Sequence, residues 1–238
     1  MNKIILSEKE NIKKILKENK RIIFNFFNSH DLYFFSKYPL FRKVISFNSI
    51  NFTDGSVISF YLSLKNLKKV RRFSGPDFIK DFFEKKEIVS KKRHFFVGFE
   101  EKDIEKLIKK FPYLDKKNLF CYNPAYIKKI KFSEKEINKI AKIINSKKTN
   151  IVWVGLGCPK QYFLTYDLFK KTKVKYFFNV GAGLDFLLGK KKRAPKIIRS
   201  LGIEWLYRLI TDFKHSKKKV WRSFVSLQYL NKVQLKNK

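Results

Sequence analysis

A glycine-containing turn carries side chains that can bind phosphate. Gly155, Gly157, Lys160 and Gln161 directly follow the apolar run Ile151–Val154. Backbone N–H groups in such a turn, together with Lys160 and Gln161, can face a phosphate or a nucleotide. The turn is neither a GxGxxG fingerprint nor a Walker loop, because lysine occupies position 160 and the spacing differs. Ordinary strand-to-helix turn chemistry is therefore the alternative.

Two acidic residues stand at other turns. Asp185 closely follows the turn at 181–183, and Asp54 precedes Gly55 after the mixed run 44–53. As a catalyst, Asp54 would be a base. The alternative is structural, because acids at such turns commonly accept hydrogen bonds from nearby backbone.

Histidine and cysteine supply no local metal-binding or nucleophilic motif. His30, His94 and His215 are far apart in sequence, and no HxxxH or Ser/His/Asp arrangement is present. Cys121 and Cys158 fit no CxxC spacing. We expect two free thiols that pack as small apolar groups, with neither a disulfide nor zinc.

These residues must be positioned by alternating strands and helices. Apolar, aromatic-rich runs predict buried strands. They are Arg21–Phe27, His94–Phe99, Leu119–Tyr122, Ile151–Val154 and Lys175–Val180. Apolar spacing predicts helices over 103–111, with Asp103 as the cap, and over 133–145, with Ser133 and Glu136 as a capping box. The alternation indicates an α/β fold, a Rossmann-like, mostly parallel sheet with helices on both faces.

The composition shifts after Gly189, which divides the chain into a core, 1–189, and a basic helical appendage, 190–238. An i, i+4 pair, Glu204 and Arg208, is expected in the appendage. Its predicted apolar helical face contains Ile198, Leu201, Trp205 and Leu209. This amphipathic segment fits either packing on the sheet or binding to an anionic bilayer.

The formal net charge of +35 requires polyanionic surroundings, and nucleic acid, anionic lipid and nucleotide phosphates are candidates. Lysine-rich codon usage is the alternative explanation. The first 20 residues lack the apolar core of a secretory signal, and no uncharged apolar run is long enough to span a membrane. We therefore expect a cytoplasmic protein that contacts the membrane only peripherally.

Several motifs, in order along the chain, resemble the WecG/TagA/CpsF glycosyltransferases (glycosyltransferase family 26). Asn28 matches an early Asn after a strand, and Thr53-Asp54-Gly55 matches the Asp-Gly turn. The other matching segments are Arg72-Phe73-Ser74-Gly75-Pro76-Asp77, Val154-Gly155-Leu156-Gly157-Cys158-Pro159-Lys160-Gln161, Asp185-Phe186 with Gly189, Arg193-Ala194-Pro195, and Leu201-Gly202-Ile203-Glu204-Trp205-Leu206-Tyr207-Arg208. The VGLGxPKQ segment is the most specific of these.

The resemblance implies an inverting, metal-independent transferase that needs no cofactor. Its donor would be a UDP-sugar of the N-acetylmannosamine type, and its acceptor an undecaprenyl-diphosphate-linked saccharide at the cytoplasmic membrane face. Asp54 would be the base, while Arg72 and Gln161 would hold donor and acceptor. Arg193, Arg208 and Arg222 of the appendage would neutralise diphosphate, which arginine forks suit.

This sequence departs from the family pattern at three positions. Phe26 stands where Thr is common, Tyr162 replaces the usual Glu after PKQ, and His215 stands near an expected Arg. The sequence leaves open the donor sugar and whether the chain forms a homo-oligomer.

Three other functions fit parts of the sequence. A nucleic-acid-binding protein would use basic and aromatic residues on one exposed sheet face, but the phenylalanines fall in apolar runs typical of a core. A dehydrogenase is disfavoured by the missing third glycine. A degenerate family member that binds a UDP-sugar without catalysis is disfavoured by Asp54, Arg72 and Gln161.

Overall fold

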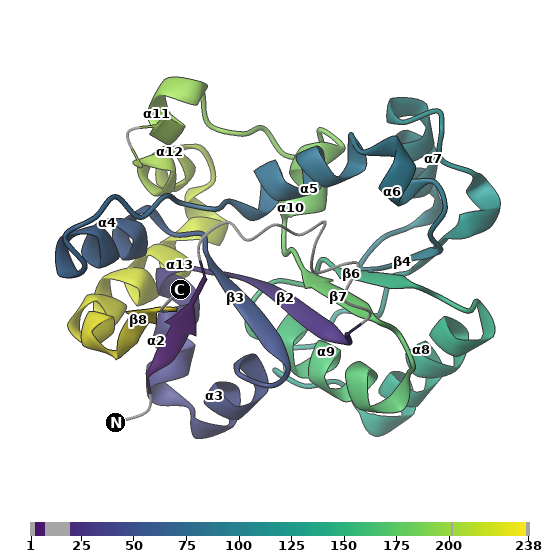
Figure 1. Ribbon diagram of the computed structural model, residues 1–238, viewed down its shortest axis with the longest axis horizontal. Coiled ribbons are helices and arrows are strands. Elements are labelled where there is room, and N and C mark those ends of the chain that lie inside the picture. The colour runs from purple at the N-terminus through teal and green to yellow at the C-terminus, as the bar shows by residue number, and fades with distance from the viewer. Residues whose placement is uncertain (1–2, 8–19, 201, 237–238) are drawn as a thin grey trace.

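The computed structural model of the protein describes residues 3–7, 20–200 and 202–236 (Figure 1). Most of the first 20 residues, on which the prediction about a secretory signal depends, lie outside this part, as does Leu201. The same holds for the side chains of Ser200, Arg208, Lys214 and His215.

A six-stranded parallel sheet forms the centre of the molecule, in the order β3-β2-β7-β6-β4-β5. Its strands are β2 (Ile22–Phe27), β3 (Ser49–Thr53), β4 (His94–Val97), β5 (Leu119–Tyr122), β6 (Ile151–Val154) and β7 (Tyr176–Asn179). The five strands expected from apolar runs are confirmed, with ends that differ by a residue or two. β3 was not predicted as a strand, because the mixed run 44–53 also contains the end of a helix and a turn.

Buried asparagines fix the register of three neighbouring strands. Asn25 of β2 lies opposite Asn51 of β3 and Asn179 of β7. The Asn25 amide donates to Asn51 Oδ1 at 2.8 Å, and the Asn179 amide donates to Asn25 Oδ1 at 2.7 Å. Because buried amides are costly without partners, this ladder favours one register and so aligns the carboxyl ends of the strands.

Helices cover both faces of the sheet, as expected for this α/β class (Figure 1). One face packs against α5 (Gly75–Phe83), α6 (Lys86–Val89), α7 (Glu101–Lys110) and α10 (Gly183–Leu187). The other packs against α2 (Ser29–Lys37), α3 (Pro39–Ile45), α8 (Glu134–Ser146) and α9 (Lys160–Lys171). Stacked aromatic rings fill the first face: Phe178 lies 4.6 Å from both Phe24 and Trp153, measured between ring centroids.

The two predicted helices are present, and the structure corrects one cap. Helix α7 begins at Glu101, so Glu100 is its cap and Asp103 lies in its first turn, where the Asp103 carboxylate accepts from the Glu100 N–H at 3.1 Å. Ser133 caps α8 as expected, by accepting from the Glu136 N–H at 3.3 Å, but the Glu136 carboxylate accepts from the Tyr122 hydroxyl at 2.8 Å, so only this half of the expected capping box is present.

The appendage forms separate helices rather than one. They are α11 (Lys196–Ser200), α12 (Glu204–Thr211) and α13 (Phe213–Ser226), followed by the 3₁₀ turn η2 (Leu227–Lys232). The expected continuous apolar face from Ile198 to Leu209 is wrong, because the chain turns at Gly202, whose φ is +75°. Glycine adopts this left-handed conformation without the steric cost that a side chain brings.

Contacts between elements of secondary structure are among those that hold the appendage on the core. Helix α13 packs on α2, and β8 (Val233–Leu235) pairs in parallel with β1 (Ile4–Leu6). The division at residue 189 stays a prediction. Among the described helices, none is both long and apolar enough to cross a membrane.

Candidate active site

Four neighbouring strands bring the sequence motifs to one edge of the sheet. In the order β3-β2-β7-β6, the loops after these strands begin at Asp54, Asn28, Val180 and Gly155. Because all four strands are parallel, their carboxyl ends lie side by side, where open α/β sheets bind ligands. The motifs that are scattered through the sequence therefore converge.

Arg72 joins the turn after β3 to the appendage. Its Nε donates to the Asp54 carbonyl oxygen at 2.6 Å and lies 3.4 Å from Asp54 Oδ1. Its Nη2 donates to Glu204 Oε2 at 3.1 Å. The Asp54 turn is itself held by its N–H, which donates to the Phe27 carbonyl at 2.9 Å. One guanidinium thus orients the candidate base and the start of α12.

The two carboxylates also act on the pKa of Arg72. Burial works to lower the pKa of the Arg72 guanidinium, but Asp54 and Glu204 outweigh burial and raise that pKa. The Glu204 carboxylate was expected to pair with Arg208 on the same helix. The structure pairs it with Arg72, and the pairing with Arg208 stays a prediction because the Arg208 side chain lies outside the described residues.

Gln161 connects the loops after β6 and β7. Its side-chain oxygen accepts from the N–H of Gly157 at 3.1 Å and from the N–H of Gly181 at 3.0 Å. Both glycines have positive φ, at 76° and 51° respectively. Gln161 is buried, so its amide positions the two turns.

The backbone N–H groups of the turn at Gly155 and Gly157 are already hydrogen-bonded within the protein. The N–H of Gly157 is taken by Gln161, and the N–H of Gly155 donates to the Val97 carbonyl at 2.9 Å. In this structure neither N–H group points to an open phosphate cradle. Lys160 donates to the Ile127 carbonyl, and its ammonium lies 4.3 Å from the centroid of the Tyr126 ring. The turn is therefore internally bonded.

An open hollow rich in positive charge lies beside Arg72. Its volume is about 390 Å³, and its lining residues are Arg72, Ser74, Asp77, Arg193, Lys196 and Arg199. We call it the basic hollow. Arg193 spans it with a fork, donating to both carboxylate oxygens of Asp77 and to Ser74 Oγ at 2.9 Å. The Arg193 Nε is buried and has no hydrogen-bond partner among the residues that the structure describes.

Asp77 is the single acid among these lining residues. Partial burial works to raise the pKa of Asp77, but the hydrogen bonds and charge of Arg193 outweigh burial and hold that pKa below its usual value. Arg199 lies 3.5 Å from the same carboxylate. Ionised Asp77 therefore orients two arginines at the hollow.

Sequence reasoning did not select Lys196 and Arg199 as site residues. They follow Arg193 at intervals of three, which on a helix would place basic groups near one another. That spacing was the available indication that the two residues lie near Arg193.

Asn28 caps α2 beside the Asp54 turn. Its side-chain oxygen accepts from the His30 N–H at 3.0 Å, and its own N–H donates to Asp31 Oδ2 at 3.0 Å. Gly55 lies so close that an added β-carbon would come within 3.3 Å of the Asn28 α-carbon. The two turns fit together because position 55 has no side chain.

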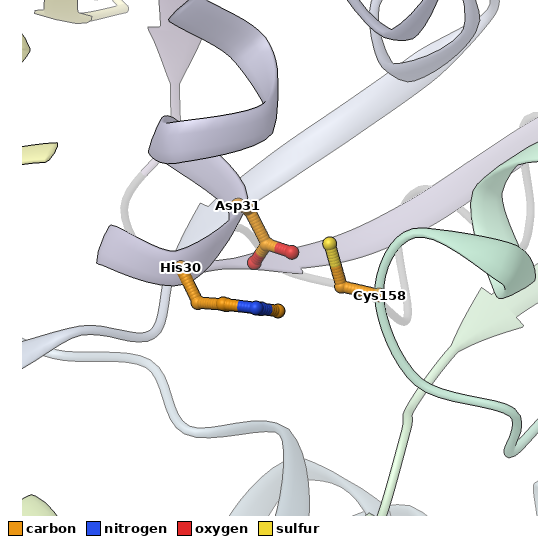
Figure 2. Close-up of side chains that lie close together, drawn as sticks. All are labelled: His30, Asp31 and Cys158. Carbon is orange, nitrogen blue, oxygen red and sulfur yellow. The ribbon is translucent and has the colours of Figure 1, made fainter. Parts of the chain in front are cut away.

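A buried polar cluster lies behind Asn28. Figure 2 shows His30 and Asp31, in the first turn of α2, converging on Cys158 from the loop before α9. One potential ligand atom from each residue lies within 4.8 Å of the others. The cluster was not expected, because Cys158 is distant in sequence. Cys121 and Cys158 are both free thiols.

Burial perturbs every member of this cluster. It raises the pKa of Asp31 to about 6, even though hydrogen bonds from Cys158, Asn28 and Tyr162 favour its ionised form. Burial, with the charges of Lys219 and Arg222, lowers the pKa of His30 to about 3. Within the described part of the chain, the His30 Nε2 has no hydrogen-bond partner. At neutral pH the cluster holds a neutral imidazole beside a carboxylate.

Of the predicted site residues whose side chains are described, only Arg72 and Arg193 line the basic hollow, and two of the others make their contacts elsewhere. Asp185 lies 3.4 Å from the Lys191 ammonium and 3.9 Å from that of Lys190. Arg222 of α13 stacks on α2, with its guanidinium carbon 5.1 Å from the centroid of the Phe34 ring. Neither residue lines the hollow.

Two of the three departures from the family pattern are buried, and the side chain of His215 is not among those described. Phe26 packs against Gly75, where an added β-carbon would lie 3.1 Å from the Phe26 ring. Tyr162 is buried and its hydroxyl is directed to Asp31, one of the interactions that act on the pKa of that carboxyl. Phe26 and Tyr162 therefore both pack in the interior, beneath the loops of the candidate site.

Comparison with known proteins adds two findings. A family profile described as "Glycosyl transferase WecG/TagA/CpsF family" matches residues 6–238. An N-acetylglucosaminyldiphosphoundecaprenol N-acetyl-beta-D-mannosaminyltransferase from Staphylococcus aureus (strain MRSA252) is 36% identical over 97 residues, which are 40% of this chain and 35% of the relative. The protein of the same name from Staphylococcus aureus (strain NCTC 8325 / PS 47) is 34% identical over the same shares.

The match to these curated relatives thus spans about a third of their length, whereas the family profile covers nearly the whole chain. The ordered motifs and the parallel α/β fold agree with that profile. On these grounds the chain belongs to the WecG/TagA/CpsF glycosyltransferase family.

Proposed function

We propose that this protein is an inverting glycosyltransferase. It moves an N-acetylhexosamine, either N-acetylmannosamine or its uronate, from a UDP donor to undecaprenyl-diphosphate-linked N-acetylglucosamine. The reaction belongs to the synthesis of a cell-envelope polysaccharide. The names of the relatives support the acceptor and the N-acetylmannosaminyl group, and the family supports the transfer.

One observation carries the proposal: Arg72 contacts the candidate base and lines a hollow built for anions. Its guanidinium contacts Asp54, and Arg72 also lines the hollow together with Arg193, Lys196 and Arg199. A transferase needs a base near the attacking hydroxyl and positive charge near the departing diphosphate. The site offers both within the reach of a single arginine.

The chemistry assigns one task to each group. The acceptor hydroxyl oxygen attacks the anomeric carbon of the donor sugar, and Asp54 takes the hydroxyl proton. The bond from that carbon to the β-phosphate oxygen breaks, and its electron pair leaves with UDP. The leaving group gains negative charge, which fixed cations stabilise most where they are already oriented. Arg193 is so oriented, because Asp77 and Ser74 hold its fork.

Positive charge suits the proposed place of action. The acceptor is anchored in a membrane, and the basic appendage supplies Arg222 and Lys217–Lys219 for an anionic bilayer. In this proposal the protein binds the inner face of the cell membrane from the cytoplasm. The reaction uses no metal, because the arginines perform the charge neutralisation.

A transfer assay tests the proposal. Radiolabelled UDP-N-acetylmannosamine and its uronate are supplied separately with an N-acetylglucosaminyl-diphosphoryl lipid, with and without EDTA. We expect lipid-linked product from one donor, unchanged by EDTA. Asp54→Asn should reduce the rate roughly 10²-fold or more, because it removes the base while keeping the shape.

Asp81→Asn is the matched control, since Asp81 is an exposed acid on α5 outside the site. It should leave the rate unchanged. Full activity of the Asp54→Asn protein would remove Asp54 as the base. Absence of product with both donors, from protein that is folded and binds UDP, would contradict the proposed reaction.

A further inference from the structure

An exposed apolar stripe runs along α4 (Ser56–Lys65), outside the appendage. The side chains of Phe60 and Leu64 are 67% and 61% exposed, and Leu67, just after the helix, is 94% exposed. They are spaced at i, i+4 and i+7, which places Phe60 and Leu64 on one face. The opposite face is buried through Ile58 and Leu62. α4 is therefore apolar on both sides, although only one side packs on the protein.

Basic residues are concentrated at the end of this stripe. Lys65, Lys68, Lys69 and Arg71 are all exposed in the segment that follows Leu64. Leu67 stands among them with φ of +51°, a backbone conformation that is unfavourable for leucine. An apolar tip beside lysines is typical of surfaces that enter the headgroup region of anionic membranes, where apolar groups insert and cations meet lipid phosphates.

The alternative occupant, a second copy of the chain, fits less well. Lysine is depleted at protein–protein interfaces, and two copies of this surface would bring like charges together. The net charge of +35 adds to that repulsion. An anionic surface supplies the complementary charge that another copy lacks.

The stripe is continuous with the appendage. Ser56, at the start of α4, donates its hydroxyl to the Gly202 carbonyl between α11 and α12 at 2.7 Å. Lys65, at its end, donates to the Val233 carbonyl of β8 at 3.3 Å. Figure 1 shows α4 at the same end of the molecule as α11, α12 and α13. Exposed Ile210, Phe213 and Trp221 occur on those helices.

The position of α4 in the chain connects this surface to the chemistry. Asp54 and Gly55 lead directly into α4, and the chain returns from Leu67 to Arg72. The Arg72 Nε donates to the Asp54 carbonyl at 2.6 Å, so this hydrogen bond joins the two ends of the segment that contains α4. A surface that binds the stripe is therefore connected to the candidate base through the segment 55–71.

We propose that Phe60, Leu64 and Leu67 form a membrane-inserting tip that binds an anionic bilayer together with the appendage and places Asp54 near the membrane surface. This inference rests on the proposed function, because a membrane-anchored acceptor is what the tip brings to the site. It adds a contact from the catalytic core to the contact expected of the appendage.

Vesicle sedimentation tests the tip without any substrate. Full-length protein is mixed with vesicles of phosphatidylglycerol and phosphatidylcholine in equal parts, or of phosphatidylcholine alone, with no lipid-linked acceptor. The variant Phe60→Gln/Leu64→Gln removes two of the three apolar side chains of the tip and keeps the helix, because glutamine is a good helix former. We expect it to bind the mixed vesicles roughly tenfold or more weakly than the parent, since two large apolar groups no longer insert. Binding to phosphatidylcholine alone should be weak for both proteins.

The matched control is Leu40→Gln/Ile130→Gln, which removes two exposed apolar side chains elsewhere. It should bind as the parent does. Circular dichroism and thermal unfolding must show all three proteins folded, and Leu67→Asn, which suits the positive φ at that position, provides a second tip variant. Unchanged vesicle binding by folded tip variants would overturn the proposal. So would a dimer of the parent that becomes a monomer in the tip variant without any loss of vesicle binding.

The test separates this inference from the proposed function. Weaker vesicle binding by the tip variant upholds the tip even if no donor yields product. Conversely, transfer that depends on Asp54, with vesicle binding indifferent to Phe60 and Leu64, upholds the reaction and rejects the tip.

Discussion

Arg72 and Glu204 form an ion pair that joins the catalytic core to the appendage, with 3.1 Å between Nη2 and Oε2. The Glu204 side chain is only 6% exposed, so this pair is shielded from solvent. Because the same guanidinium also bonds Asp54, the position of α12 and the position of the candidate base are mechanically linked. The appendage is in this way part of the site.

Breaking that pair should affect both stability and transfer. Glu204→Gln keeps the shape but removes the charge, and we expect it to lower the free energy of unfolding by about 1–3 kcal/mol, the usual cost of breaking a shielded charged hydrogen bond. Transfer should fall because Arg72 loses one of its two anchors. Urea denaturation and the transfer assay measure the two effects.

Glu134→Gln is the control for this prediction. Glu134 pairs with Lys171, but its side chain is 68% exposed, so its loss should cost less than about 0.5 kcal/mol. Equal effects of the two substitutions would show that the Arg72–Glu204 pair has no special role.

Gln161 should have two roles. Its side-chain oxygen stabilises the two turns, and its lack of charge allows a donor diphosphate to bind nearby. Gln161→Ala leaves the N–H groups of Gly157 and Gly181 without their acceptor. We expect a loss of about 3 kcal/mol in the free energy of unfolding, since an unsatisfied buried donor typically costs about 1–3 kcal/mol. Chemical denaturation checks this value.

Gln161→Glu distinguishes the two roles. A carboxylate still accepts both hydrogen bonds, so the protein should be more stable than the alanine variant. Transfer should nevertheless fall, because the new negative charge opposes a donor diphosphate. A glutamate variant with parental activity would place the diphosphate away from the loops after β6 and β7.

The sequence predicted those parts of the fold that depend on local patterns. Apolar runs identified five strands, and the spacing around Ile137 and Ile140 identified α8, because burial on one face imposes that spacing. β3 was not predicted because the run 44–53 also contains the end of α3 and a turn, and because Asn51, which is buried and bonded to Asn25 of β2, adds a further polar residue to it. A polar residue that is satisfied only in the folded sheet looks like a loop residue in the sequence.

Long-range partners explain the other differences at the site. A local rule pairs Glu204 with Arg208 one turn away, but it cannot reveal the bond that Glu204 accepts from Arg72, which is distant in sequence. The grouping of His30 with Cys158 likewise arises because β2 and β6 are separated in the sheet by β7 alone. Family motifs identified Asp54 and Arg72, whereas the basic hollow emerged only from the packing of α5 against the appendage.

Asp31 should make stability depend on pH. Its pKa is about 6 in the folded protein against an ordinary 3.8, so its contribution to stability is fully present below about 3.8 and is lost as the pH rises through about 6. Asp31→Asn abolishes this titration. The free energy of unfolding of the variant relative to the parent should therefore rise by about 2 kcal/mol between pH 4.5 and pH 7.5.

Urea denaturation of both proteins at the two pH values measures that difference. His30 has the opposite sign, because its pKa is lowered to about 3 and its contribution is lost as the pH falls below 6.5. Since both proteins keep His30, most of that effect cancels. A relative stability that does not change with pH would show that Asp31 titrates normally.

Asp77 orients the arginines of the basic hollow, but it also competes with a bound diphosphate for them. Its removal should reveal which effect is larger. Asp77 holds the Arg193 fork and lies 3.5 Å from Arg199, and its lowered pKa keeps it ionised at neutral pH. An incoming diphosphate must therefore displace a carboxylate. We expect Asp77→Asn to bind inorganic pyrophosphate about threefold to tenfold more tightly, because the hollow gains a unit of positive charge while Ser74 still holds Arg193.

Calorimetric titration at low and high salt measures this affinity. Asp81→Asn changes the net charge equally from an exposed position on the same helix, so it controls for the overall field of the protein. Arg193→Ala should weaken binding. If Asp77→Asn weakens binding to the same extent as Arg193→Ala, orientation outweighs competition, and the arginine fork acts only while the carboxylate holds it. If Asp77→Asn instead binds pyrophosphate more tightly, and this gain disappears at high salt, the gain comes from the increased net charge of the hollow. We expect this outcome because Arg72, Arg193 and Arg199 line the hollow together with a single carboxylate.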